Sequence, residues 1–190
     1  MENFIETIEG ESYSSIHPRA LEHEGCIVDI GCYDWNWSNF LIGKKRVIGV
    51  DPFESRIPEG AELFKGLIGT SNGITGLNFN NHASTVTNNN ENILDSSLFP
   101  VLSWKTFCKK YDIDKISILK MNIEGSEYPL LHSMDLEDFE KIDQIIVSFH
   151  NWLNPNWEYL TKHSFGLLGD MGFELHCINW QYRWYLGLKK

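Results

Sequence analysis

The stretch that decides the fold is CIVDIGCYDWNWSNFLIGKKRVIGVD, residues 26–51. Two apolar, β-branched runs, 26–30 and 47–50, end in Gly31 and Asp51, and a short amphipathic segment lies between them. This pattern predicts a strand, a loop, a helix and a second strand, as in the first unit of a parallel α/β sheet. In such sheets ligands bind at the carboxyl ends of the strands, and an acid about 20 residues after the glycine accepts hydrogen bonds from a ribose. We therefore expect a nucleoside-containing cofactor between Gly31 and Asp51.

Length and charge restrict the class of protein. The chain has 190 residues, of which 42% are hydrophobic, so we expect one domain over residues 25–190, preceded by an arm or short helix over residues 1–24. A net charge of -10 argues against a nucleic-acid partner, because phosphate backbones are bound by clustered Lys and Arg. No apolar run reaches membrane-spanning length and the first residues are acidic without an apolar leader, which predicts a cytoplasmic protein.

Cysteines and histidines show no metal-ligand spacing. The four cysteines form no CxxC pair, and three of them (Cys26, Cys108 and Cys177) fall at apolar positions of predicted elements, so we expect reduced, buried thiols. The histidines are scattered, and no metal site is predicted.

The rest of the chain continues the alternation of strands and helices, with one interruption. Residues 66–97 are rich in Asn, Gly, Ser and Thr, which predicts a long surface excursion with one strand near residues 84–87; His82 within it is expected to face solvent. The other predicted strands cover residues 61–65, 116–121, 142–149, 173–178 and 183–188, and the predicted helices begin near Ser103, Glu127 and Asn156.

Two further strand ends carry polar side chains. Glu124 follows the predicted strand 116–121, and His150 follows the strand 142–149. Together with Gly31 and Asp51, they make four successive parallel strands that deliver polar groups to one edge of the sheet. For each of the two an alternative stays open: Glu124 could stabilise the following helix through its dipole, and His150 could hold the neighbouring loop.

These segments resemble the FkbM-type methyltransferases. ISILKMNIEGSEYPLL, residues 116–131, resembles the family signature, in which a lysine-apolar-Asp-apolar-Glu-Gly-x-Glu run ends the fourth strand. VDIG (28–31) is similar to the family's first S-adenosylmethionine motif, GVDPFE (49–54) to its second-strand acid followed by proline, and IIVSFH (145–150) to its fifth-strand segment ending in histidine.

The resemblance implies a Rossmann-like α/β fold, a mostly parallel seven-stranded sheet with a C-terminal antiparallel hairpin. It also implies S-adenosylmethionine as the methyl donor, with transfer to a hydroxyl of a small molecule or sugar. By position, Asp29 and Gly31 would border the methionine and ribose, Asp51 would bind the ribose hydroxyls, with Glu54 on the same loop, and Leu67 and Ile68 would lie near the adenine. Asn122 occupies the signature's Asp position, and Glu124 and His150 would face the transferred methyl group.

A hydroxyl acceptor has to lose its proton, and histidine is the side chain best suited to take it near neutral pH. We therefore expect His150 to be the base and Glu124 to orient it or the acceptor. Four tryptophans of the C-terminal third are candidates either for an acceptor pocket or for core packing: Trp152, Trp157, Trp180 and Trp184.

The chain departs from the family pattern at two places. Cys32, Tyr33, Asp34 and Trp35 replace a glycine-containing loop, and Asn122 replaces an Asp. Trp35 either blocks the amino-acid end of the cofactor or rotates outward and covers the site. These departures keep two alternatives open: a catalytically inactive methyltransferase-like binding or scaffold protein, and, on Gly31 and Asp51 alone, a nicotinamide-dependent oxidoreductase.

Overall fold

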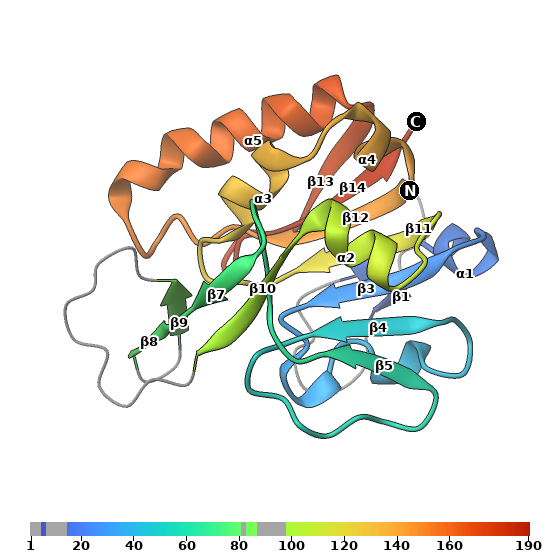
Figure 1. Cartoon of the computed structure of the whole chain (residues 1–190). Helices are drawn as coiled ribbons and strands as arrows, with labels where there is room; N and C mark the ends of the chain where they lie inside the picture. Colours follow the sequence, from blue (N-terminus) through green and yellow to red (C-terminus); the bar gives the residue numbers. More distant parts are fainter. Residues whose placement is uncertain (1–4, 7–14, 81–82, 87–97) are drawn as a thin grey trace.

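A seven-stranded sheet forms the centre of the molecule (Figure 1). The computed structural model describes residues 5–6, 15–80, 83–86 and 98–190. The strand order is β13-β14-β12-β11-β3-β4-β5. The strands are β3 (Cys26–Ile30), β4 (Val47–Val50), β5 (Ala61–Phe64), β11 (Ile116–Met121), β12 (Ile142–Ser148), β13 (Phe173–Asn179) and β14 (Trp184–Lys189).

The pairing within this sheet is mostly parallel. Strands β5, β4, β3, β11 and β12 run parallel to one another, whereas β14 pairs antiparallel with both β12 and β13. A mostly parallel seven-stranded sheet that closes on an antiparallel hairpin confirms the expected fold class. Because the central strands are buried on both faces, they consist of near-continuous apolar residues.

One face of the sheet carries most of the helices. The helices α2 (Trp104–Lys110), α3 (Glu127–Ser133), α4 (Leu136–Glu140) and α5 (Glu158–Asp170) bury their apolar side chains there, and Figure 1 shows α3, α4 and α5 together on this side. The Ser103 hydroxyl accepts a hydrogen bond from the Thr106 backbone N–H, so Ser103 is the N-cap of α2, as the sequence predicts. Gly172 follows α5 with a left-handed φ of 85°, a conformation that glycine adopts without strain.

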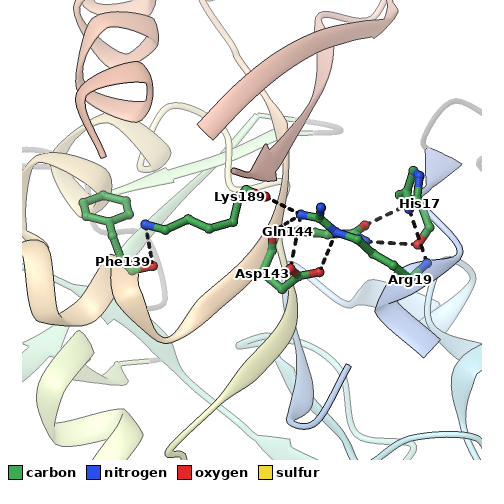
Figure 2. Close-up of polar contacts among 6 residues, drawn as sticks. All are labelled: His17, Arg19, Phe139, Asp143, Gln144 and Lys189. Carbon is green, nitrogen blue, oxygen red and sulfur yellow. Dashed lines mark hydrogen bonds and ion pairs between the residues drawn. The ribbon is translucent and has the colours of Figure 1, made fainter. Parts of the chain in front are cut away.

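The opposite face is covered by a smaller group of elements: α1 (Arg19–Glu22) and the 3-10 turns η1 (Tyr33–Trp35) and η2 (Asn39–Leu41). Polar contacts fix α1 to the sheet (Figure 2). The Arg19 guanidinium pairs with the Asp143 carboxylate at 3.2 Å and donates to the Lys189 carbonyl at 2.7 Å, while His17 and Gln144 exchange two hydrogen bonds. The segment before β3 is thereby tied to the start of β12 and the end of β14.

The helix predicted between β3 and β4 is wrong. The structure has only η1 and η2 there, because Asp34 and Trp35 adopt positive φ values of 60° and 57°, which right-handed helices exclude.

The prediction of a surface excursion over residues 66–97 with a single strand near 84–87 is also wrong in part, because this range contains further strands. Strands β6 (Leu67–Gly69) and β7 (Gly73–Thr75) flank β10 (Phe99–Ser103) in a second sheet, because Val101 and Leu102 supply an apolar strand directly before the α2 N-cap. The hairpin of β8 (Leu77–Asn80) and β9 (Ala83–Val86) includes most of the strand predicted at 84–87, whereas His82 and Thr87 lie outside the described residues.

Three minor elements and the cysteines complete the description. Strands β1 (Ile5–Glu6) and β2 (Ser15–Ile16) pair with each other, and η3 (Pro155–Trp157) precedes α5. Cys26, Cys32 and Cys108 are buried free thiols, but Cys177 is exposed, contrary to expectation, because it lies on the outermost strand of the sheet. In the part of the chain that the structure describes, no helix has the length and apolar character needed to cross a membrane.

Candidate active site

The carboxyl ends of four parallel strands meet at one edge of the sheet. Gly31 follows β3, Asp51 follows β4, Asn122 follows β11 and His150 comes two residues after β12. The Gly31 N–H donates to the Val50 carbonyl at 2.8 Å, and the Asn122 N–H donates to the Ile30 carbonyl at 3.0 Å. A Cβ atom on Gly31 would stand 2.1 Å from the Asn122 carbonyl oxygen, so only glycine lets these strand ends approach each other so closely.

Asp51 is buried and keeps one carboxylate oxygen unused. Its Oδ1 accepts hydrogen bonds from the backbone N–H groups of Phe53 and Glu54 at 2.8 and 3.0 Å. Burial raises the pKa of this carboxyl, although the two N–H donors partly oppose the effect. Its second oxygen, Oδ2, accepts no bond from the described residues, so it is available to a hydroxyl donor.

Glu54 holds its own loop. Its carboxylate accepts hydrogen bonds from the backbone N–H groups of Asp34, Ser55 and Arg56 at 2.9, 2.7 and 2.7 Å. Burial alone would raise the pKa of Glu54, but these donors bring it below its ordinary value. Because both oxygens are engaged, Glu54 connects the η1 turn to the loop after β4, and the structure gives it no free acceptor to share in the role of Asp51.

Asp29 lies within the sheet and is paired with two buried side chains. Its Oδ1 stands 2.8 Å from the Lys120 Nζ on the neighbouring strand, and its Oδ2 accepts a 2.7 Å hydrogen bond from the Ser38 hydroxyl. The same Lys120 ammonium donates to the Gly31 carbonyl at 2.7 Å. All of these side chains are buried. Asp29 therefore holds the Lys120 ammonium, which in turn bonds the carbonyl of the Gly31 turn.

The Trp35 indole packs on the face of β4. It is 1% exposed, its Nε1 donates to the Arg56 carbonyl at 2.7 Å, and a Cβ atom on Gly49 would lie 2.4 Å from its ring. Of the two alternatives for Trp35, outward rotation over the site is wrong, because the absence of a side chain at Gly49 leaves space on β4 that the indole fills.

The other residues expected at the cofactor lie on β6 and after β11. The side chains of Leu67 and Ile68 point to opposite faces of β6. Ile68 is buried in the core beneath the helices, whereas Leu67 is half-buried. The Asn122 side chain is partly exposed beside the glycine turn. Leu67 and Asn122 thus retain accessible surface, and Ile68 contributes chiefly to the core.

The strongest polar cluster of the edge surrounds His150. Its Nδ1 lies 3.1 Å from Glu127 Oε1, and the same oxygen accepts the His150 backbone N–H at 2.8 Å. On the other side of the ring, Nε2 lies 3.4 Å from Glu124 Oε1. The imidazole thus stands between two carboxylates, and Glu127 fixes its orientation.

These two carboxylates determine the protonation of His150. Burial alone would lower the pKa of the imidazole, but the bonds to Glu124 and Glu127 favour the charged form and raise the pKa to about 9. In this arrangement His150 carries a proton at neutral pH.

Glu124 sits on a strained turn that an aromatic ring covers. Glu124 and Gly125 have left-handed φ values of 53° and 98°, and a Cβ atom on Gly125 would stand 2.4 Å from the Trp157 ring. The Gly125 N–H donates to Glu127 Oε2 at 2.8 Å. Glu124 Oε2 is buried and has no hydrogen-bond partner among the described residues. A buried acceptor without a donor is costly, so this oxygen is ready to interact with a ligand.

Glu127 is the residue that the sequence interpretation missed as part of the site. It is fully buried, and it bonds both His150 and the Gly125 turn. The signal was present, because Glu127 is the second acid of the EGSE segment. Its position three residues after Glu124 places both acids at the start of α3, facing the end of β12.

The four C-terminal tryptophans separate into two groups. Trp184 is buried in the core, and Trp157 packs on Gly125. Trp152 is 62% exposed with its ring centroid 5.9 Å from that of His150, and Trp180 on the turn between β13 and β14 is 79% exposed. Trp152 is therefore the tryptophan that the structure places beside the His150 cluster.

Two open hollows lie elsewhere. Their volumes are about 360 and 380 Å³, and they share Asp112, Ile113 and Asp114, near the amino-terminal ends of β3 and β11. Ligands of open α/β sheets bind at the opposite ends of the strands, so we do not assign the cofactor to these hollows. Within the described ranges, no three His, Cys, Asp or Glu side chains form a group that could hold a metal ion.

Comparison with known proteins identifies the family. Residues 29–175 match the family model described as the Methyltransferase FkbM domain. The chain belongs to this family. The expected relationship to FkbM methyltransferases is thereby confirmed. The match begins near the end of β3 and extends over β4, β11 and β12, so it includes all four strand ends that carry the site.

A solved structure shows the same fold. The crystal structure of the methyltransferase FkbM from Methylobacillus flagellatus KT aligns with a TM-score of 0.51 and 15% sequence identity, over 87% of this chain and 43% of that chain. This chain therefore spans less than half the length of that FkbM protein. Comparison with curated proteins gives no match.

Proposed function

We propose that this FkbM-family chain is an S-adenosylmethionine-dependent O-methyltransferase that acts on a hydroxyl group of a small molecule or sugar. The observation that carries the proposal is the position of His150 between Glu124 and Glu127, at the same sheet edge as Gly31 and Asp51. One half of this edge suits a nucleoside, and the other half suits proton transfer.

Residues at the strand ends fit the cofactor. The close approach at Gly31 leaves backbone rather than side chain at the turn, and Asp51 Oδ2 is free to accept bonds from ribose hydroxyls. Asn122 and Leu67 supply partly exposed surface nearby, and the buried Glu124 oxygen offers negative charge to a cationic group. When bound, S-adenosylmethionine would supply an activated methyl group.

In the proposed mechanism, His150 takes the proton of the acceptor hydroxyl at Nε2. Glu127 binds Nδ1 and the backbone N–H of the same residue, so it holds the ring in one orientation and leaves Nε2 directed to Glu124. Glu124 orients the ring or the acceptor. A positioned base contributes about 10²–10⁴-fold in rate, and alignment of the reacting groups contributes the larger part of the acceleration.

Trp152 suggests the chemistry of the acceptor. Its exposed ring lies beside His150 and offers a flat apolar surface to a sugar or another cyclic alcohol. Trp180 is exposed on the hairpin turn, and the Tyr182 carbonyl of this turn accepts a hydrogen bond from Ser148 at the end of β12. Both rings therefore lie toward the edge that carries His150.

A non-catalytic member of the family is the second candidate. Asn122 stands where the signature has an acid, and the two glutamates favour a protonated His150, which cannot act as a base. The buried position of Trp35 supports the catalytic candidate instead, because the indole occupies the face of β4 and not the strand ends.

Isothermal titration with S-adenosylmethionine, S-adenosylhomocysteine and NAD tests the proposed cofactor. We expect micromolar binding of the first two and none of NAD, and loss of binding in Asp51→Ala. Glu62→Gln on the exposed side of β5 is the matched control and should bind normally. Binding of NAD alone would favour the oxidoreductase. Binding of S-adenosylmethionine without turnover of any alcohol in a panel of glycosides and cyclic alcohols would favour the non-catalytic candidate.

A further inference from the structure

The two glutamates around His150 make a site for one positive charge. Glu127 is fully buried and Glu124 is 22% exposed, and both carboxylates contact the same imidazole from opposite sides. With a protonated ring the three groups carry a net charge of about -1, and with a neutral ring about -2, which a buried site tolerates poorly.

This arrangement conflicts with the role of a base. A base must be neutral before it accepts a proton, yet Glu124 and Glu127 stabilise the imidazolium form of His150. Something has to replace the positive charge on the ring before the ring can accept the hydroxyl proton. Glu124 Oε2 is buried and accepts no hydrogen bond from the residues that the structure describes, so it is the atom of the cluster available to a replacement cation.

We propose that Glu124 and Glu127 hold a single positive charge throughout the reaction, on the His150 imidazolium in the free protein and on the donor's sulfonium in the complex. Binding of the donor then expels the proton from His150 and creates the base. This inference rests on the proposed function, because it requires a sulfonium donor at this edge of the sheet.

The charge also balances through the transfer itself. His150 Nε2 accepts the hydroxyl proton while the oxygen–methyl bond forms and the sulfur–methyl bond breaks, with the bonding electron pair left on sulfur. The sulfonium becomes a neutral thioether, and the neutral imidazole becomes an imidazolium. The two glutamates therefore face one positive charge before and after the step, and no charge has to enter or leave the buried site.

The other charged groups on the neighbouring elements do not bond to the His150 ring within the described residues. Glu158 at the start of α5 is bonded to the Asn151 side chain, and Arg183 lies on the turn between β13 and β14, where its carbonyl accepts the Phe149 N–H. On the neighbouring strands, Lys120 is paired with Asp29 and Asp51 accepts backbone N–H groups. Among the described residues, the charged groups bonded to the His150 ring are thus Glu124 and Glu127.

Proton counting by titration calorimetry tests this inference without an acceptor. The donor is titrated at pH 7.5 in two buffers of different ionisation enthalpy, and S-adenosylhomocysteine is titrated in the same way. We expect release of about one more proton with S-adenosylmethionine than with S-adenosylhomocysteine. The two ligands share the amino acid and the ribose, so the difference isolates the sulfonium.

Matched variants assign the proton. His150→Gln should remove the difference between the two ligands, and Glu124→Gln should reduce it. His132→Gln is the control, because this α3 histidine contacts Ser164 and not the cluster, and it should keep the full difference. Nitrogen-15 NMR of the imidazole should show His150 protonated at pH 7.5 in the free protein and with S-adenosylhomocysteine, and neutral with S-adenosylmethionine.

The possible results distinguish failure of this inference from failure of the proposed function. Binding of both ligands with equal proton release, or a His150 ring that stays protonated with S-adenosylmethionine, overturns this inference and leaves the proposed cofactor standing. Absence of binding by either ligand overturns the proposed function, and this inference with it.

Discussion

Acidic residues lie on both sides of the sheet edge that carries the site, on β3, after β4 and after β11, but their bonding partners differ. On the β3–β4 side, Asp29 is paired with Lys120 and Ser38, and Glu54 accepts three backbone N–H groups. On the β11–β12 side, Glu124 and Glu127 converge on one imidazole, and one Glu124 oxygen has no hydrogen-bond partner in the part of the chain that the structure describes. We call the β3–β4 side, where Asp29 and Glu54 hold neighbouring groups in place, the scaffold half. We call the β11–β12 side, where two acids contact one histidine ring, the proton-centred half. An acid's place at a strand end therefore does not reveal its role, whereas its partners do.

We expect the largest loss of stability from a substitution that breaks the buried ion pair of the scaffold half. Lys120→Met leaves the Asp29 carboxylate buried without its cation, and loss of one partner of a buried ion pair costs about 3–5 kcal/mol. Urea denaturation followed by circular dichroism measures the loss of unfolding free energy.

The paired variant Lys120→Met with Asp29→Leu is the control, because apolar replacement of a whole buried pair is often neutral. It should recover most of the stability. If Asp29→Asn instead leaves stability unchanged and abolishes S-adenosylmethionine binding, Asp29 belongs to the cofactor site and not to the scaffold.

The proton-centred half should reveal itself in the pH dependence of stability. The pKa of His150 is raised from 6.5 to about 9 in the folded protein, so its contribution is full below pH 6.5 and is lost as the pH rises through about 9. We expect the unfolding free energy to fall by on the order of 3 kcal/mol over this window relative to His150→Gln. Parallel stability curves for the two proteins would show that the glutamates do not hold a proton on this ring.

Asp51 and Glu54 provide a matched test within the scaffold half. Asp51→Asn weakens the acceptor offered to a ribose, and a hydrogen bond to a charged group is worth about 1.5–3 kcal/mol, so affinity for S-adenosylhomocysteine should fall roughly 10- to 100-fold. Glu54→Gln removes a neighbouring charge of the same kind, but the structure gives this side chain only backbone partners, and affinity should stay within about 3-fold. Equal losses would place both acids in the cofactor site.

The smallest effect is expected at Trp35. Trp35→Phe removes the hydrogen bond to the Arg56 carbonyl and leaves a small void on Gly49, which costs about 1–2 kcal/mol of stability. Because the indole lies on the sheet face, S-adenosylhomocysteine affinity should change little. A marked gain in affinity would show that Trp35 obstructs the cofactor.

Much of this architecture could be predicted from the sequence, because apolar runs and their terminal residues are local signals. The strands that end at Ile30, Val50 and Met121 lie where the pattern places them, and the same holds for the Ser103 cap and Gly172 after α5. The family relationship is confirmed over residues 29–175.

Features that depend on backbone strain or on long-range contacts could not be predicted. The left-handed φ values of Asp34 and Trp35, which replace the expected helix, are stabilised by contacts with Glu54, Arg56 and Gly49. Likewise, nothing local to Asp29 indicates that Lys120, 91 residues later in the chain, neutralises it across the sheet register. The roles of Gly31, Asp51, Leu67, Ile68, Asn122, Glu124 and His150 in binding and catalysis stay predictions.

The contact between Gly125 and Trp157 has a consequence for how this sequence can change over evolutionary time. Any side chain at position 125 meets both a left-handed backbone and the indole at 2.4 Å, so a substitution there is deleterious while Trp157 is present. A smaller residue at 157 relieves only the steric half of the problem and uncovers the turn that carries Glu124. The effect of a substitution at one position therefore depends on the residue at the other, and neither residue can be replaced alone without a loss.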